Sequence, residues 1–226
     1  MILEVCASNF EIAKEAAQAG ADRLEICQNL SQGGLTPSYG FIEKACQLDL
    51  PIRVLIRPRA GDFDYSVDEL ETMLNDIRIC EDLGAEAVVI GAVSQENRLD
   101  KRANQVILES SERLKFIFHR GIDIAGTEGV AEAYALGFDG ALCSGHLRGL
   151  QAGVQNLQRY LECGSKDFEL VAGGGLKPEM VRVIQNIGLS SFHFSCQKIL
   201  GEERDDYNHR IVFDQMKWEQ FDRLRK

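Results

Sequence analysis

Short apolar runs alternate along the chain with longer stretches whose apolar residues have helical spacing. The apolar runs have the length of buried strands, and each is followed by enough residues to form a helix. Strict alternation of strand and helix favours right-handed crossover connections and a parallel sheet. Eight strands are predicted, at Leu3 to Ala7, Arg23 to Cys27, Arg53 to Arg57, Ala87 to Gly91, Lys115 to Arg120, Gly140 to Ser144, Phe168 to Ala172 and Ser191 to Ser195.

The number of strands decides between two parallel-sheet architectures. Eight strand–helix units in 226 residues fit a closed (β/α)8 TIM barrel, which forms one α/β domain at this length. An open doubly wound sheet is the alternative, but it usually has fewer strands and a glycine-rich turn after the first of them. Here residues 6–9, Cys-Ala-Ser-Asn, follow the first strand. We therefore expect a single TIM-barrel domain over residues 1–226.

Three helix starts are predicted from capping residues. Ser66 with Glu69, and Ser8 with Glu11, have the spacing of a capping box, in which side chains and backbone exchange hydrogen bonds at the helix start. Thr36 precedes a proline, which is typical of an N-cap residue followed by the first residue of a helix. These signals predict helices after the first, second and third strands.

The C-terminal segment is predicted to close the barrel from outside. Residues 201–208 are polar and are expected to form a mobile loop after the eighth strand. Residues 211–226 are expected to form a closing helix. Its predicted apolar face consists of Phe213, Met216, Trp218, Phe221 and Leu224. We expect Trp218 to serve as a packing contact or to touch another copy of the chain, so a homo-oligomer is compatible with the sequence.

The composition limits the kinds of partner and the compartment. The formal net charge is -10, and an acidic surface argues against binding to nucleic acid or to an anionic membrane. A metal ion or a small anionic molecule is the expected partner. We find no signal peptide and no apolar run long enough to span a bilayer. Seven dispersed cysteines without a disulfide framework indicate a cytoplasmic protein with reduced thiols.

A carboxylate and a thiol lie two residues apart in each of the first two predicted strands. They are Glu4 and Cys6, and then Glu25 and Cys27. Because side chains alternate between the faces of a strand, both polar groups of each pair should point the same way. If the two strands are neighbours, two cysteines and two glutamates converge on one small region. Burying such groups without compensation is costly, which indicates a functional site.

A structural role for the same residues is the alternative. The two glutamates could neutralise Arg53 or Arg57 inside the barrel, although burying such a network rarely stabilises a fold outright. The cysteines would then act as small apolar side chains. The sequence leaves both interpretations open.

Function in a TIM barrel is located where the strands end at their C-terminal side. Six of the eight predicted strands place ionisable groups there. Among these, Glu25, His119, Glu4 and His193 are the candidates for acid–base catalysis, with Glu25 or His119 as the base. For one such histidine, a hydrogen-bonded core position would be the default interpretation. Two histidines that converge on carboxylates favour a functional site.

A run of three glycines follows the seventh predicted strand. Gly173, Gly174 and Gly175 let the backbone approach a ligand closely and leave N–H groups free. Loops after strands seven and eight often bind phosphate in barrels, so the run predicts an anion site together with Arg57 and Arg59. A tight turn before a helix is the alternative, but a turn needs only one glycine.

Several stretches together resemble the CutC family, whose proteins are described as cytoplasmic copper homeostasis proteins with a TIM-barrel fold. The resemblance runs from residue 1 to about residue 196. Its specific stretches are Gly33-Gly34-Leu35-Thr36-Pro37-Ser38 and Arg57-Pro58-Arg59-Ala60-Gly61-Asp62-Phe63. It is also carried by Glu4-Val5-Cys6, residues 20–27, Phe118-His119-Arg120, Ala172-Gly173-Gly174-Gly175 and Phe192-His193.

The resemblance implies a copper-related role, with Cu(I) ligation proposed for the cysteines that match Cys6 and Cys27. Soft Cu(I) accepts two or three thiolates, and neighbouring strands would bring both sulfurs near one ion. The second hypothesis is an enzyme that acts on a small anionic molecule bearing a phosphate or a carboxylate. Glu25 or His119 would then be its base, and Arg57 or Arg59 would stabilise a developing oxyanion.

Overall fold

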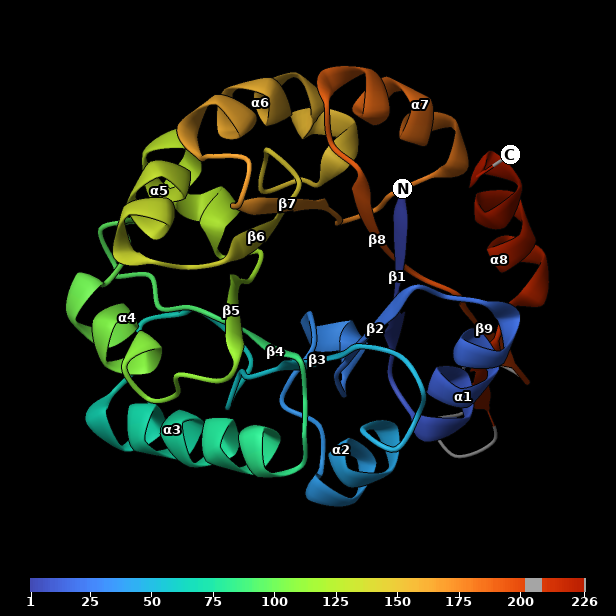
Figure 1. Ribbon diagram of the computed structural model, residues 1–226, viewed down its shortest axis with the longest axis horizontal. Coiled ribbons are helices and arrows are strands. Elements are labelled where there is room, and N and C mark those ends of the chain that lie inside the picture. The colour runs from blue at the N-terminus through green and yellow to red at the C-terminus, as the bar shows by residue number, and fades with distance from the viewer. Residues whose placement is uncertain (202–208, 226) are drawn as a thin grey trace.

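The computed structural model describes residues 1–201 and 209–225 and confirms the closed barrel (Figure 1). The barrel strands pair in sequence order, every neighbouring pair is parallel, and the eighth strand pairs with the first. They are β1 (Ile2–Ala7), β2 (Arg23–Ile26), β3 (Ile52–Leu55), β4 (Ala87–Ile90), β5 (Lys115–Phe118), β6 (Gly140–Cys143), β7 (Glu169–Ala172) and β8 (Ser191–Ser195).

The helices form an outer ring around these strands, as Figure 1 shows. They are α1 (Phe10–Ala19), α2 (Tyr39–Ala45), α3 (Val67–Asp82), α4 (Lys101–Leu108), α5 (Ile122–Leu136), α6 (Leu150–Cys163), α7 (Pro178–Ile187) and α8 (Gln215–Asp222). Short 3-10 turns occur at η1 (Leu30–Gln32) and η2 (Arg223–Arg225). Within the described ranges, none of the helices has the length and apolarity that crossing a bilayer would require.

One of the three predicted helix starts is confirmed. Ser66 and Glu69 form the capping box at the start of α3. The other two are wrong. Asn9 caps α1, because its side chain accepts a hydrogen bond from the backbone of Ile12, and the residue before α2 is Ser38. The hydroxyl of Thr36 instead accepts a 2.9 Å hydrogen bond from the backbone N–H of Arg57, which ties the β2 loop to the end of β3.

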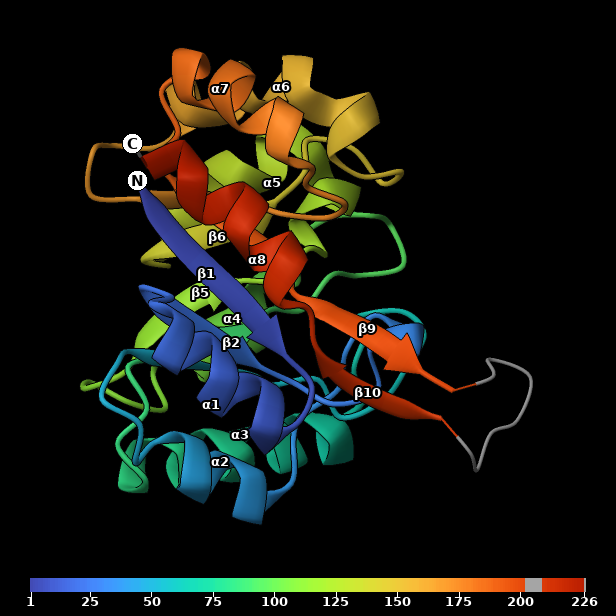
Figure 2. The same ribbon diagram turned by 90° about the vertical axis from the view of Figure 1, so that its right-hand side faces the viewer.

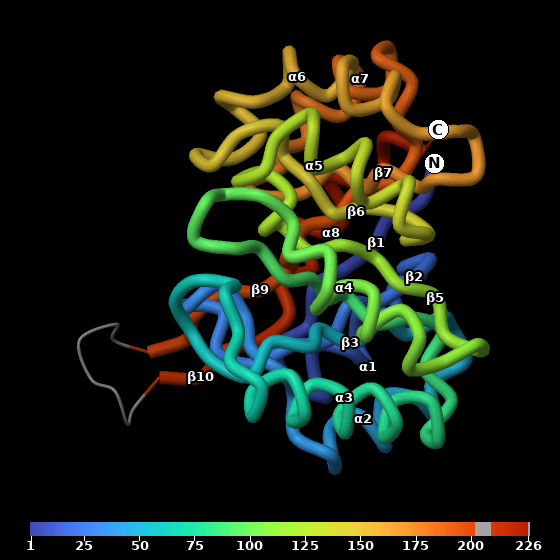
Figure 3. The backbone as a smooth tube through the Cα atoms, turned by 90° about the vertical axis from the view of Figure 1, so that its left-hand side faces the viewer, coloured from blue at the N-terminus to red at the C-terminus, as the bar shows by residue number. Residues whose placement is uncertain are grey.

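The C-terminal segment differs from the sequence prediction. An antiparallel hairpin, β9 (Gln197–Leu200) with β10 (Arg210–Phe213), follows β8 and projects from the barrel (Figures 2 and 3). The closing helix therefore begins at Gln215, capped by the side chain of Asp214, and not at residue 211. Most of the predicted mobile loop, residues 202–208, lies outside the described residues.

Helix α8 covers the barrel through its aromatic residues. Trp218 and Phe221 are buried, and the Phe221 ring stacks on Phe194 of β8 with centroids 3.8 Å apart. Trp218 is therefore a packing contact. Met216 was predicted on the same face, but it is 72% exposed. The helical register places it on the outer side once the helix starts at Gln215.

The barrel interior is filled in layers of different polarity. At the N-terminal end lies a cluster of four charged side chains, here called the base network, made of Glu4, Arg23, Arg53 and Glu169. Arg23 donates hydrogen bonds to both carboxylates, and Arg53 pairs with Glu169 at 2.5 Å and lies 3.5 Å from Glu4. An apolar layer follows, which includes Leu55, Val89, Ile117, Leu142 and Val171.

Replacing Glu4 tests whether the base network stabilises the fold. Glu4→Gln leaves Arg23 with Glu169 alone and removes one of the carboxylates near Arg53, so the free energy of unfolding at pH 7 should fall by about 3 kcal/mol. The control Glu128→Gln removes an exposed partner of Arg98 and should cost less than about 1 kcal/mol. Urea unfolding measures both variants, and equal losses would contradict a stabilising role.

The loss of stability in Glu4→Gln should depend on pH. Burial alone would raise the pKa of Glu4, but a hydrogen bond with His193 and the charges of Arg23 and Arg53 lower it from 4.5 to about 2. A carboxyl whose pKa is lowered on folding stabilises the fold above its unfolded pKa and loses this contribution as the pH falls through the folded pKa. The stability difference between wild type and Glu4→Gln should shrink as the pH falls from about 5 towards 2. Urea unfolding at several pH values measures it, and a constant difference would refute the linkage.

Candidate functional site

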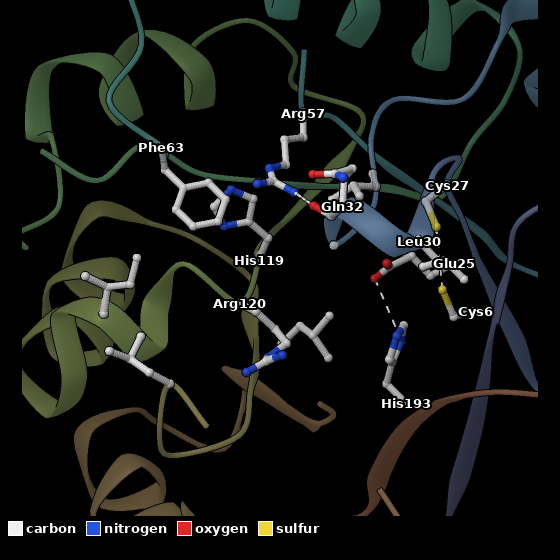
Figure 4. Close-up of a pocket in the computed structure, with 15 residues that line it drawn as sticks. Cys6, Glu25, Cys27, Leu30, Gln32, Arg57, Phe63, His119, Arg120 and His193 are labelled. Atoms are coloured by element: carbon white, nitrogen blue, oxygen red, sulfur yellow. Dashed lines mark hydrogen bonds and ion pairs between the residues drawn. The ribbon is translucent and has the colours of Figure 1, made fainter. Parts of the chain in front are cut away.

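A cavity of about 280 Å³ opens at the C-terminal ends of the barrel strands and is called here the mouth cavity (Figure 4). It collects side chains from distant parts of the sequence. Figure 4 shows Cys6, Cys27, Glu25 and His193 gathered at one side, with Phe63 and His119 at the other. The lining residues are Cys6, Glu25, Cys27, Leu30, Gln32, Gly33, Leu55, Arg57, Phe63, His119, Arg120, Ile124, Leu142, Leu147 and His193.

The thiols of two cysteines lie next to each other in the lining of the mouth cavity. The Cys6 and Cys27 sulfurs lie 3.6 Å apart, and both side chains are buried. The parallel register pairs Cys6 with Glu25, and Cys27 lies two residues after Glu25, one residue past the end of β2, where its N–H still bonds to Ala7 O. The hydrogen bond to Cys27, burial and the charges of Glu25 and Glu4 raise the pKa of Cys6 well above its usual value. The Cys6 thiol therefore stays protonated near neutral pH unless a cation offsets the thiolate charge.

The two glutamates have different surroundings. Glu4 belongs to the base network, where it accepts a hydrogen bond from Arg23 and lies 3.5 Å from Arg53. Glu25 has no arginine partner within hydrogen-bond distance in the described chain, and its buried Oε2 atom has no hydrogen-bond partner. Burial raises the pKa of Glu25 to about 7, against the opposing charge of His193. Glu25 can therefore hold or release a proton near neutral pH.

His193 links the base network to the mouth cavity. Its Nδ1 atom lies 2.7 Å from Glu4 Oε1 and 3.8 Å from Glu25 Oε2. Burial disfavours the charged ring, but the carboxylates of Glu25 and Glu4 outweigh burial and raise the pKa of His193. Gly173 packs against this ring, since a Cβ there would lie 3.1 Å from His193 Cδ2. The position of His193 is thus set from two sides.

His119 lies across the cavity from the thiols. Its Nδ1 accepts a hydrogen bond from the Gly121 backbone at 3.2 Å, which assigns the remaining proton to Nε2. That Nε2 atom is buried and has no partner among the described residues. Burial lowers the pKa of His119 to about 3, so the ring is neutral. The Nε2–H group is therefore an unused hydrogen-bond donor in the cavity wall.

The two arginines predicted for an anion site are placed differently. Arg57 lines the mouth cavity, but its guanidinium donates to the backbone carbonyls of Gln32 at 2.8 Å, Gly34 at 3.0 Å and Gly61 at 2.7 Å. Arg59 is not among the lining residues, because it pairs with Glu69 and Asp62 on the outside. The chain leaves β3 at Leu55, so strand alternation no longer governs where Arg59 points.

The three glycines after β7 differ in their surroundings. Gly173 donates its N–H to Cys143 O and is part of the barrel wall. Gly174 and Gly175 line a second cavity of about 330 Å³, beside Arg120 and Lys217. Neither Arg120 nor Lys217 was assigned to an anion site from the sequence. Arg120 lies at the C-terminal end of the fifth predicted strand beside His119, and Lys217 is brought in by α8, which follows the hairpin that no strand pattern predicts.

One set of donor atoms fits a metal ion. Cys6 Sγ, a Glu25 oxygen and a His193 nitrogen all lie within 4.8 Å of one another, and Cys27 Sγ adjoins Cys6. All seven cysteines are within the described residues and are free. The arrangement can therefore supply sulfur, nitrogen and oxygen ligands without a disulfide having to be broken.

Comparison with known proteins gives consistent matches. The sequence profile of the CutC family matches residues 1–198. A CutC protein of Agrobacterium fabrum is 35% identical over 202 residues, which cover 88% of this chain and 80% of that protein. The human copper homeostasis protein cutC homolog is 34% identical over 200 residues, covering 87% and 73%.

Solved structures agree with these matches. A CutC structure from Streptococcus agalactiae superposes with a TM-score of 0.80 at 30% identity and covers 85% of this chain and 97% of that one. A dihydrodipicolinate synthase of Bacillus anthracis, with a TM-score of 0.65 at 10% identity, shares the fold alone.

The two histidines of the site should differ in charge in the metal-free protein. At pH 5, His119 should be neutral with its proton on Nε2, because its pKa is about 3, whereas His193 should be charged. Nitrogen-15 NMR of the imidazole rings measures this, with His119→Gln and His193→Gln assigning the signals. Titration of His119 between pH 5 and 7 would contradict the assignment.

Proposed function

This chain belongs to the CutC family, and from that premise we propose that it binds Cu(I) between the thiols of Cys6 and Cys27. The observation that carries the proposal is the 3.6 Å separation of the two sulfurs inside the mouth cavity. The human relative bears the name of a copper homeostasis protein, and copper homeostasis is the role described for the family.

The donor chemistry suits a soft ion. Thiolates select Cu(I) and zinc, imidazole suits copper as well, and the hard ions magnesium and calcium prefer oxygen ligands. Cys6, Cys27 and His193 would hold the ion, which would add a positive charge where two carboxylates and two thiols meet. Glu4 accepts the hydrogen bond of His193 Nδ1 and so would orient the ring, as carboxylates do for metal-binding histidines.

The protonation state of the thiols supports the same proposal. Because the pKa of Cys6 is raised, binding of Cu(I) must displace protons, and apparent affinity should decrease as the pH falls. The site also requires both cysteines to be reduced. A cytoplasmic location, where glutathione and thioredoxin keep thiols reduced, is consistent with this requirement.

Titration with Cu(I) against a chromophoric chelator tests the proposal. Changing Cys6 and Cys27 together to Ser should lower affinity by more than about 100-fold, since even outer-shell partners contribute 10- to 100-fold. The matched control changes Cys46 and Cys163 to Ser, two partly exposed cysteines outside the cavity, and should keep wild-type affinity. Equal affinity of the Cys6/Cys27 variant and wild type would remove these residues from any account of copper.

A second candidate function is acid–base catalysis on a small anionic molecule. It is favoured by three buried atoms of residues lining the mouth cavity that have no hydrogen-bond partner among the described residues: Glu25 Oε2, His119 Nε2 and Arg57 Nε. Glu25, with a pKa of about 7, would serve as the base. His119 Nε2–H would donate to an oxyanion that develops on the substrate. Buried polar groups without hydrogen-bond partners are uncommon, and a catalytic role is one explanation for them.

Deuterium exchange tests this second function. Small phosphorylated and carboxylated carbonyl compounds are incubated with the protein in D2O, and loss of the proton next to the carbonyl is followed by NMR. Glu25→Gln should slow any exchange catalysed by the wild type by at least about 100-fold. The control Glu43→Gln changes an exposed glutamate on α2 and should leave the rate unchanged. Equal rates for wild type and Glu25→Gln would exclude Glu25 as the base.

A further inference from the structure

A second cavity, called here the side cavity, adjoins the mouth cavity on the side of β7, β8 and α8. Its volume is about 330 Å³, and it shares the lining residues Cys6, Leu30, Gly33, Arg120 and His193 with the mouth cavity. Its further lining residues are Gly174, Gly175, Leu176, Phe194, Ser195, Gln197 and Lys217. A molecule that occupied both cavities would therefore contact residues of this shared lining.

Two cationic side chains line the side cavity. Arg120 and Lys217 line it, and no described residue of its lining is an Asp or Glu, although the chain carries a net charge of -10. Arg120 is held by Asp123 at 3.4 Å through Nε and by Ser144 at 3.1 Å through Nη2. Its Nη1 group has no partner among the described residues, and the same is true of the half-buried Lys217 ammonium. Both cations are available to a ligand.

Backbone donors face the same space. Gly174 and Gly175 have φ angles of 91° and 85°, and their N–H groups bond to no acceptor in the described chain. The loop is fixed because Leu150 donates to Gly174 O at 3.0 Å. A Cβ at position 174 would lie 2.7 Å from Arg120 Cζ, so only glycine lets the guanidinium lie against the loop. Consecutive N–H groups in such turns form concave anion-binding sites.

We propose that the side cavity binds the phosphate of a small phosphomonoester whose remainder extends into the mouth cavity towards Glu25 and His119. The guanidinium of Arg120 offers planar donors, Lys217 a point charge, and Gly174 and Gly175 backbone N–H groups. Loops after strands seven and eight are where barrels commonly hold phosphate. The proposal goes beyond copper binding and does not depend on it, because Cys27 does not line the side cavity.

Isothermal titration tests the site with inorganic phosphate and with glycerol phosphate, at an ionic strength matched by sodium chloride. The wild type should bind both probes. Arg120→Gln and Lys217→Gln should each weaken binding at least about tenfold, because each removes a charge-assisted hydrogen bond. Arg59→Gln is the matched control: it removes an arginine at the same end of the barrel that does not line either cavity and should keep wild-type affinity.

The variants distinguish phosphate binding in the side cavity from a general effect of salt and from copper binding. Equal phosphate affinity in wild type and Lys217→Gln would overturn the proposal, and this variant changes only a partly exposed position on α8, so folding is not at risk. Equal weakening by Arg59→Gln would also overturn it. Cys27→Ser should keep phosphate binding whether or not it binds Cu(I), and loss of phosphate binding in this variant would contradict separate sites.

Discussion

The carboxylate of Glu4 is the interaction on which the rest of the barrel interior depends. It is 1% exposed, accepts from Arg23, lies 3.5 Å from Arg53 and holds His193 at 2.7 Å. An unpaired charge at this depth would be very costly, so the surrounding cations are required for the fold. Since His193 also lines the mouth cavity, the base network fixes the position of a side chain in that cavity.

This arrangement separates two glutamates that look equivalent in sequence. Glu4 contacts the two arginines of the base network, and its pKa is lowered. Glu25 lies beside His193, its pKa is about 7, and its Oε2 atom has no hydrogen-bond partner among the described residues. Perturbed titratable groups in a cavity are typical of functional sites. In the two proposals, the thiols of the mouth cavity would hold the soft ion, and the cations of the side cavity would hold the anion.

Much of this follows from sequence periodicity. The alternation of strand and helix predicted the barrel, and the period of two along β1 and β2 predicted that Cys6 and Cys27 meet. Prediction failed where the chain leaves regular structure. Arg59 lies beyond the end of β3, so strand alternation could not show that it turns outward to Glu69. The hairpin of β9 and β10 was missed because its strands are short and Phe213 is their only buried residue, so no buried face gives a strand pattern.

The central claim is that two cysteine sulfurs at the barrel mouth hold a single Cu(I) ion. X-ray absorption at the copper edge of the protein loaded with one equivalent of Cu(I) tests it most directly. We predict scattering from two sulfur ligands in the wild type and a loss of sulfur scattering when Cys6 and Cys27 are changed together to Ser. A copper environment of nitrogen and oxygen alone in the wild type, or the same sulfur scattering in the double variant, would contradict the account.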